Sequence, residues 1–203
     1  MRSLLPLLPL LLASLAFGAD SKPLLNEKPL PSIAAPGFKE PLGAEWSQAK
    51  GKWTPDNGVL HMVEIPEDKH VPVLHHKVGL SAAVIELDFK QDAAGAFYVG
   101  CDSDKHVGRV VVLGGNVVIQ EDSAKASHTV GSLKYNAKVG EWHHLRVEWK
   151  EDKMAFAIDD QAPVSAQHAY FTTTKKRSWL AGSKTADVKN LTINGEKSTE
   201  AKK

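Results

Sequence analysis

Hydrophobic and polar residues alternate most regularly in the stretch 140–160. The alternation has a period of two on both sides of Glu151-Asp152, which is typical of two strands joined by a tight turn. A turn centred there puts both apolar rows on one face, whereas a shift of one residue would expose one row to water. The pattern therefore predicts a β-hairpin with a well-defined register. The predicted core pairs are Trp149 with Met154, Val147 with Phe156, and Leu145 with Ile158.

The other face of this hairpin carries His144, Arg146 and Glu148 on its first arm, opposite the small residues Ala155 and Ala157 on its second. Small residues beside charged ones leave open space next to the charged groups. The hairpin therefore predicts one apolar core row and one polar row suited to the floor of a ligand groove.

Strand signals recur along most of the chain. Asn57-Gly58 and Gly114-Gly115-Asn116 each separate two apolar-rich stretches, as tight hairpin turns do. Roughly ten to twelve short strands with regularly spaced turns are typical of a sandwich. The fold is therefore predicted to be all-β, a two-sheet antiparallel β-sandwich of the jelly-roll type. Other predicted strands lie in AAVIELDFK, GAFYVGC, RSWLAG and DVKNLTING.

Residues 1–18 are predicted to be a secretory signal peptide. Arg2 precedes an apolar run that ends in small residues at Gly18. The run is too short and too interrupted by proline to form a membrane helix. Cleavage is expected after Gly18, with Ala16 and Ala19 as the alternatives. The mature protein is therefore expected to be secreted or periplasmic, and not embedded in a membrane.

Three further segments follow the signal peptide. Residues 19–37 contain four prolines and no periodic pattern, which predicts a leader that is mobile or lies on the surface. The jelly-roll domain is expected to span residues 38–195. Residues 196–203 are rich in charge and are expected to form a solvated tail.

Composition narrows the range of partners and of stabilising devices. Of the 203 residues, 42% are hydrophobic and 24% are charged, which fits a globular protein. Without Arg2 the chain has 24 basic and 24 acidic residues, so it has no general attraction to nucleic acid. Cys101 is the single cysteine, so it has no internal disulfide partner and is expected to be buried and inert.

Several landmarks occur in the order found in a known fold family. They are Trp53 before Asp56-Asn57-Gly58-Val59-Leu60, then Glu86-Leu87-Asp88-Phe89, then Gly140-Glu141-Trp142-His143-His144-Leu145-Arg146-Val147 leading to Ile158-Asp159. This order resembles the concanavalin A-like lectin/glucanase jelly roll over nearly all of residues 38–195. It looks most like the laminin-G-like modules and the 3-keto-disaccharide hydrolase family (domain of unknown function 1080). The resemblance implies a glycan or another small-molecule ligand.

Catalysis is uncertain and less expected than binding. The jelly-roll glucanases carry an E-x-D-x-E pattern, and glycoside cleavage generally needs two carboxyl groups. Here Glu86 and Asp88 are followed by Lys90, or by Gln91 if one residue is inserted, so the second glutamate is missing. The remaining candidates for acid or base are Glu86, Asp88, His144 and Glu148.

No cofactor is expected, with calcium as the alternative. Adjacent histidines on a strand point to opposite faces, so neither His75-His76 nor His143-His144 can chelate one ion. Asp102 and Asp104 offer hard oxygen ligands after a strand, as laminin-G-like modules often do, and they are the candidate calcium ligands.

A ligand face follows if the ELDF strand, the strands of Tyr98 and Arg109, and the hairpin at 140–160 share one sheet. Their polar side chains would then lie together on its outer, concave face, with Lys90 among them. Trp179 and Tyr98 are the candidates for stacking on sugar rings, and the other tryptophans are expected in the core. The predicted ligand-binding residues are Glu86, Asp88, Tyr98, Arg109, His144, Arg146, Glu148 and Trp179.

The expected function is an exported, non-catalytic carbohydrate- or ligand-binding jelly-roll module. One alternative is a glycoside-active hydrolase or lyase of the 3-keto-disaccharide hydrolase type. Another is a structural or protein-interaction domain of the cell envelope. The sequence leaves the oligomeric state open.

Overall fold

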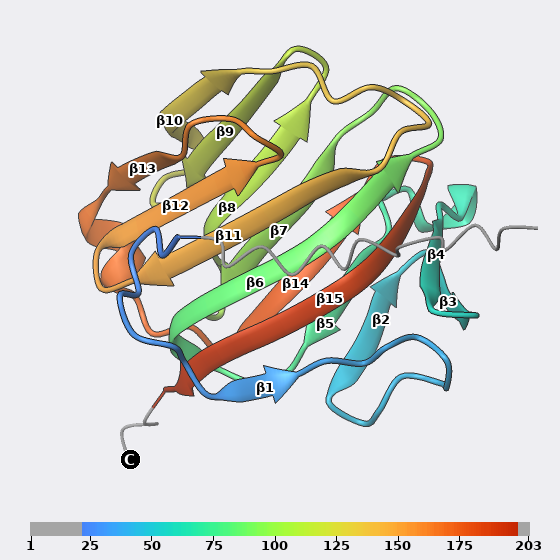
Figure 1. Cartoon of the computed structure of the whole chain (residues 1–203), viewed down its shortest axis with the longest axis horizontal. Coiled ribbons are helices and arrows are strands. Elements are labelled where there is room, and N and C mark those ends of the chain that lie inside the picture. The colour runs from blue at the N-terminus through green and yellow to red at the C-terminus, as the bar shows by residue number, and fades with distance from the viewer. Residues whose placement is uncertain (1–21, 199–203) are drawn as a thin grey trace, which may run out of the picture.

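The computed structural model describes residues 22–198, which form two antiparallel sheets packed face to face (Figure 1). The strand order of the first sheet is β13-β12-β11-β6-β15-β4-β3, and β1 pairs with β15 outside this path. The order of the second sheet is β10-β9-β8-β7-β14-β5-β2. The predicted all-β, two-sheet antiparallel sandwich is therefore confirmed.

The first sheet contains β1 (Ser32–Ala34), β3 (Lys52–Asp56), β4 (Val59–Val63), β6 (Leu80–Gln91), β11 (His143–Lys150), β12 (Lys153–Ile158), β13 (Val164–Gln167) and β15 (Thr185–Lys197). The second contains β2 (Trp46–Lys50), β5 (Val73–His76), β7 (Phe97–Asp102), β8 (His106–Leu113), β9 (Asn116–Glu121), β10 (His128–Lys134) and β14 (Arg177–Gly182). Two 3₁₀ helices, η1 (Pro66–Asp68) and η2 (Ala169–Thr172), lie in connecting segments.

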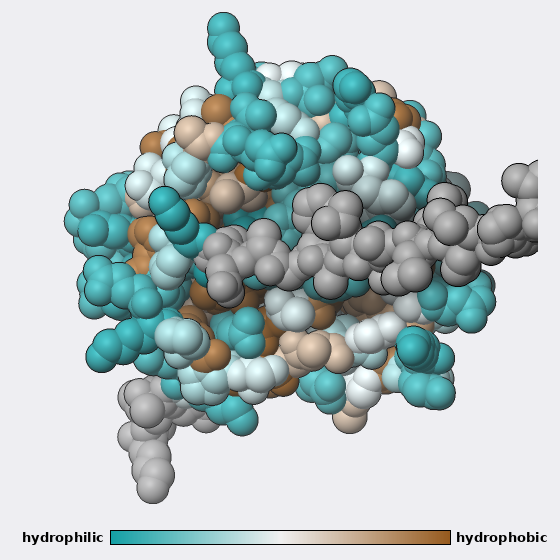
Figure 2. All heavy atoms as spheres, in the orientation of Figure 1, coloured by the Kyte–Doolittle hydropathy of each residue, from teal (hydrophilic) through white to brown (hydrophobic). Residues whose placement is uncertain are grey.

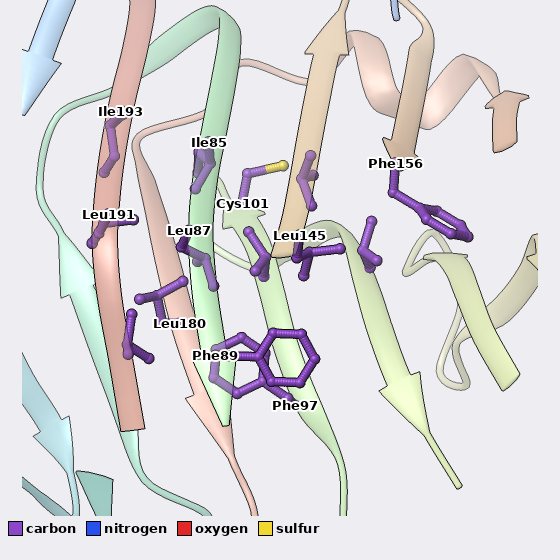
Figure 3. Packing of buried hydrophobic residues seen from close by; sticks show 14 of the residues in the cluster. Ile85, Leu87, Phe89, Phe97, Cys101, Leu145, Phe156, Leu180, Leu191 and Ile193 are labelled. Atoms are coloured by element: carbon purple, nitrogen blue, oxygen red, sulfur yellow. The ribbon is translucent and has the colours of Figure 1, made fainter. Parts of the chain in front are cut away.

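The core fills the space between the inner faces of the two sheets. Phe89 of β6 stacks on Phe97 of β7, with ring centroids 4.6 Å apart and planes 5° from parallel (Figure 3). Side chains from opposite sheets therefore interlock across the sandwich. Cys101 is fully buried in the same cluster, and burial raises the pKa of its thiol to about 12, which keeps the thiol protonated and inert.

The β11–β12 hairpin has the register that its sequence predicts. Leu145 pairs with Ile158, Val147 with Phe156 and Trp149 with Met154, and all six side chains are buried. Arg146 and Glu148 face Ala157 and Ala155 on the other side. Alternation decides this register because any shift of one residue would move a complete apolar row into water.

The ends of the domain differ from the predicted boundaries. β15 continues through Lys197, and the N–H of Ser198 donates to the carbonyl of Gly79 at 2.9 Å, so the tail begins later than residue 196. The described part of the leader, residues 22–37, contributes β1, which pairs with β15. The predicted signal peptide, residues 1–18, lies outside the described residues. Within residues 22–198 no helix is long and apolar enough to cross a membrane.

The prediction that one sheet carries all the candidate ligand residues is wrong. β6, β11 and β12 belong to the first sheet, whereas β7, β8 and β14 belong to the second. Tyr98, Arg109 and Trp179 are therefore on the opposite outer face of the molecule. An alternating pattern tells which side of a strand is buried, but both sheets of a sandwich bury one side, so the pattern does not tell which sheet a strand joins.

The second sheet holds the indole of Trp179 against the backbone at Gly100. A Cβ atom added at Gly100 would lie 2.4 Å from that ring, closer than van der Waals contact allows. We expect Gly100→Ala to lower the free energy of unfolding by about 1–3 kcal/mol, because the indole must move. Gly114→Ala is the matched control, since nothing lies within 4 Å of the added atom. Denaturant titration of both variants checks this, and equal midpoints for the two would contradict it.

Candidate functional site

The outer face of the first sheet carries a group of interacting polar side chains from β6, β11 and β15. In the ladder of β6 and β11, His144 lies directly opposite Asp88, and Arg146 lies directly opposite Glu86. Directly opposed residues with opposite charges attract each other across a sheet. We refer to Glu86, Asp88, His144, Arg146 and Asn190 as the polar strip.

His144 bridges the two carboxylates of β6. Its Nδ1 lies 2.8 Å from Oδ1 of Asp88, and its Nε2 lies 3.0 Å from Oε1 of Glu86. These hydrogen bonds, with Asp88 contributing most and Glu86 next, outweigh the effect of burial and raise the pKa of His144 to about 9. At neutral pH the ring is therefore an imidazolium that donates one hydrogen bond to each carboxylate.

Asp88 is held in its ionised form by the same contacts. Burial acts to raise its pKa, but hydrogen bonds from His144 and Asn190 outweigh burial, and the pKa of Asp88 lies below its usual value. The Nδ2 of Asn190 donates to Oδ2 of Asp88 at 2.7 Å. Asn190 reaches Asp88 because β15 bulges between Lys189 and Thr192, and the φ of Asn190 is +52° there. Asp88 therefore has no proton to give at neutral pH.

Arg146 links the strip to a buried carboxylate. Its Nη1 lies 3.4 Å from Oε2 of Glu86, and its Nη2 lies 2.8 Å from Oε1 of Glu148. Glu148 is fully buried, because residues 24–26 of the leader lie over it and donate to it. Glu148, a predicted ligand residue, thus has no free surface for a ligand.

Trp142 is the exposed indole on this face. Its residue is 37% exposed, and the ammonium groups of Lys189 and Lys90 lie 4.1 and 5.2 Å from its ring centroid. Cations beside an indole interact with its negative face. Trp142 lies two residues before His144 and four before Arg146, and side chains two residues apart on a strand point to the same face. This spacing could have placed Trp142 on the polar face from the sequence. The expectation that Trp142 belongs to the core is wrong.

Trp179 is buried, although it was a predicted stacking residue. It is 5% exposed, and its Nε1 donates to Oδ1 of Asp102 at 2.6 Å, so its indole has almost no open face for a sugar. Tyr98 is half-buried beside it, with ring centroids 6.4 Å apart. Arg109 is engaged by Asp122 at 3.0 Å and by Gln120 and Ser127. These three residues do not join the polar strip.

The two candidate calcium ligands have other partners. Asp102 is buried and accepts from Trp179, from Arg177 at 3.1 Å and from His106 at 2.8 Å. Asp104 is paired with Lys176 at 2.8 Å. Across residues 22–198 there is no group of three or more histidine, cysteine, aspartate or glutamate residues that could hold a metal ion.

A groove of about 620 Å³ lies beside the polar strip, between the leader and the first sheet. In the space-filling view, hydrophilic residues gather toward the top and the edges of this face, with apolar residues between them (Figure 2). The strip and the groove share Glu86 and Arg146, so a ligand on one can reach the other. The sheet contributes Val84, Glu86, Arg146 and Asn194, and the leader contributes Lys22, Pro23, Asn26, Glu27, Lys28, Pro29 and Leu30.

Several solved structures share this fold, while no protein-family model and no curated protein matches the sequence. A carbohydrate-binding module from Bacillus subtilis is 15% identical, with a TM-score of 0.59, over 74% of this chain and 96% of that chain. A Bacillus subtilis protein of unknown function with a galectin-like fold is 8% identical, with a TM-score of 0.62, over 83% and 97%. The Bacillus licheniformis β-glucanase is 10% identical, with a TM-score of 0.60, over 82% and 98%.

These likenesses establish the fold. The chain has the fold of a concanavalin A-like jelly roll, as the order of its sequence landmarks indicates. The narrower resemblances to laminin-G-like modules and to the 3-keto-disaccharide hydrolase family stay predictions. Function is a separate question, because one fold hosts many activities.

Stability should depend on pH through His144. Its pKa of about 9 in the folded protein is above the value of about 6.5 expected in the unfolded chain. Its contribution is therefore complete below pH 6.5 and is lost as pH rises through 9. Because the side chain of His144 is 46% exposed, we expect about 1 kcal/mol, well below the full linkage value.

His144→Gln provides the comparison for this prediction. We expect the wild type to lose additional unfolding free energy between pH 6 and pH 9.5 in urea titrations, and we expect His144→Gln to abolish this additional loss. Parallel pH curves for the two proteins would contradict the assigned pairing. Asp88 has the opposite sign, since its pKa is lowered, and its contribution is lost as pH falls through the acidic range.

Proposed function

We propose that this protein is a non-catalytic glycan-binding module, exported by its signal peptide, that binds its ligand on the polar strip beside Trp142. Two chemical features of this face support a sugar ligand. Carboxylate and amide oxygens of Asp88, Glu86 and Asn190 can accept hydrogen bonds from sugar hydroxyl groups. The indole of Trp142 offers an apolar surface for the C–H face of a sugar ring.

The main support for a module without catalysis is the imidazolium of His144, which lies between Glu86 and Asp88. Glycoside hydrolysis needs one carboxyl group that keeps its proton and a second carboxylate that acts as base or nucleophile. Here Asp88 is held ionised by its partners, and Lys90 or Gln91 stands where the pattern of glucanases has its second glutamate. The arrangement favours holding a ligand over cutting one.

The names of the structural neighbours support a glycan as the class of ligand. Their names include a carbohydrate-binding module and a β-glucanase. This support is an analogy of fold, so the proposal depends on the chemistry of the polar strip for its site.

The test is a glycan-array screen of the wild-type protein, followed by analysis of the bound glycans for cleavage products. We expect binding with no released sugar over many hours. Release of a reducing sugar or keto-sugar that disappears in Asp88→Asn would contradict the proposal and favour a hydrolase or lyase. Absence of binding to every glycan would favour a structural or protein-interaction role instead.

A further inference from the structure

A buried carboxylate on β11 fixes the leader to the face that carries the polar strip. Glu148 accepts hydrogen bonds from the backbone N–H groups of Leu24, Leu25 and Asn26 at 3.0, 2.9 and 2.9 Å. Arg146 donates to the same carboxylate through its Nε and Nη2, both at 2.8 Å. Three consecutive backbone donors thus converge on one side chain more than a hundred residues away in sequence.

The charge of Glu148 explains why this docking is firm. Burial acts to raise its pKa, but the three backbone donors and Arg146 outweigh burial, and the pKa of Glu148 lies below its usual value. A buried charge is costly unless hydrogen bonds compensate it. Undocking the leader would remove most of these donors at once, so the docked state is strongly preferred.

The side chain of Asn26 adds further hydrogen bonds between the leader and the first sheet. It is buried, and its Nδ2 donates to Oε2 of Glu148 at 3.0 Å and to the carbonyl of Ala83 at 3.3 Å. It therefore binds β11 and β6 together. A single side chain of the leader spans the two strands that carry most of the polar strip.

The leader is held at its far end as well. The N–H of Gly195 donates to the carbonyl of Pro31 at 2.8 Å, and Ser32 pairs with Asn194 at the start of β1. The stretch from Asn26 to Leu30 between these anchors lines the groove of about 620 Å³. In Figure 1 the leader, in blue, passes over the end of the first sheet before it reaches β1. Because the leader is anchored at Glu148 and again at β1, the stretch between these two anchors forms one wall of the groove.

We propose that residues 22–30 of the leader close one end of the polar strip, so that the protein takes the end of a glycan chain and not a stretch from its interior. This inference rests on the proposed glycan-binding function. Trp142 and Glu148 are six residues apart along β11 and its preceding residue, which is about 20 Å. A sugar chain that lies along the strip from Trp142 meets the leader at Glu148 and has to stop there.

The first arm of the test measures docking of the leader by hydrogen exchange, without any ligand. We expect the amides of residues 24–26 to be protected in the wild type and to exchange at least tenfold faster in Glu148→Gln, which keeps the shape but removes the charge. Glu141→Gln, at an exposed position, should leave them unchanged. Unprotected amides in the wild type would overturn the proposal, whatever the protein binds.

The second arm compares chain ends with chain interiors. The probes are β-glucan and galactan hexasaccharides, each with free ends and with both ends capped by bulky fluorophores. We expect capping to weaken binding to the wild type at least tenfold, and Asn26→Ala, which loosens the leader, to recover much of this loss. Equal binding of free and capped probes would overturn the proposal that the leader closes the strip, but it would leave the proposed glycan binding intact. Failure of every probe to bind the wild type would overturn both.

Discussion

Glu148→Ala is expected to lower the free energy of unfolding by about 3–5 kcal/mol, the range for removing one partner of a buried ion pair. The change leaves the guanidinium of Arg146 largely buried without one of its carboxylates, and it leaves the N–H groups of residues 24–26 without their acceptor. Each orphaned buried donor adds a desolvation cost. The loss should therefore exceed that of an ordinary surface substitution several-fold.

Glu141→Ala is the matched control for this prediction. Glu141 precedes the same strand, is exposed, and pairs with Lys138 at 3.4 Å in solvent. Exposed pairs of this kind contribute about 0–1 kcal/mol. Denaturant titration of both variants measures the difference, and a Glu148→Ala protein within 1 kcal/mol of the wild type would show that the leader is not anchored by this carboxylate.

Trp142→Ala is expected to weaken glycan binding at least tenfold, which corresponds to about 1.4 kcal/mol. Aromatic side chains at the centre of a contact typically carry much of the binding energy. Because Trp142 is partly exposed and outside the core cluster, its removal should change the free energy of unfolding by less than about 1 kcal/mol. Calorimetric titration and denaturant titration of one preparation give both numbers.

Leu113→Ala is the control for Trp142→Ala. Leu113 is also 37% exposed, but it lies at the end of β8 in the second sheet. Its removal should leave glycan affinity unchanged. Equal losses of affinity in both variants would point to a general effect on folding and against a contact between the sugar and Trp142.

Local patterns predicted the local structure well. The register of the β11–β12 hairpin, the burial of Cys101 and the two-sheet sandwich all follow from alternation, turn residues and composition. Each of these features depends on residues close together in sequence, or on burial alone. The same patterns also placed His144, Asp88 and Glu86 on one face, because all three alternate with core residues.

Long-range features were beyond the reach of those patterns. The anchoring of the leader joins residues 24–26 to Glu148, and nothing in the proline-rich stretch indicates a buried partner. Asn190 enters the strip only because β15 bulges, and a bulge shifts the alternation from which faces are read. The candidate residues are divided between two sheets because the chain crosses from one sheet to the other between strands. The alternation of apolar and polar residues does not encode these crossovers.

The roles within the strip were also hidden from sequence. Glu86, Asp88 and His144 were candidates for acid or base because carboxylates and histidines commonly serve in that way. Instead, His144 lies within hydrogen-bond distance of both carboxylates. These contacts raise the pKa of His144 and lower the pKa of Asp88, so Asp88 is ionised at neutral pH and has no proton to donate. Glu148 was predicted to bind a ligand, but it accepts hydrogen bonds from the leader of its own chain.

The most direct test of the central claim is nuclear magnetic resonance mapping of the bound glycan on the isotope-labelled protein. The account predicts that the indole N–H of Trp142, the side-chain amide of Asn190 and the ring of His144 shift on titration, while the indole N–H of Trp179 and the amides around Arg109 do not. Shifts confined to Trp179, Tyr98 and Arg109, with the polar strip unchanged, would contradict it and move the ligand to the second sheet.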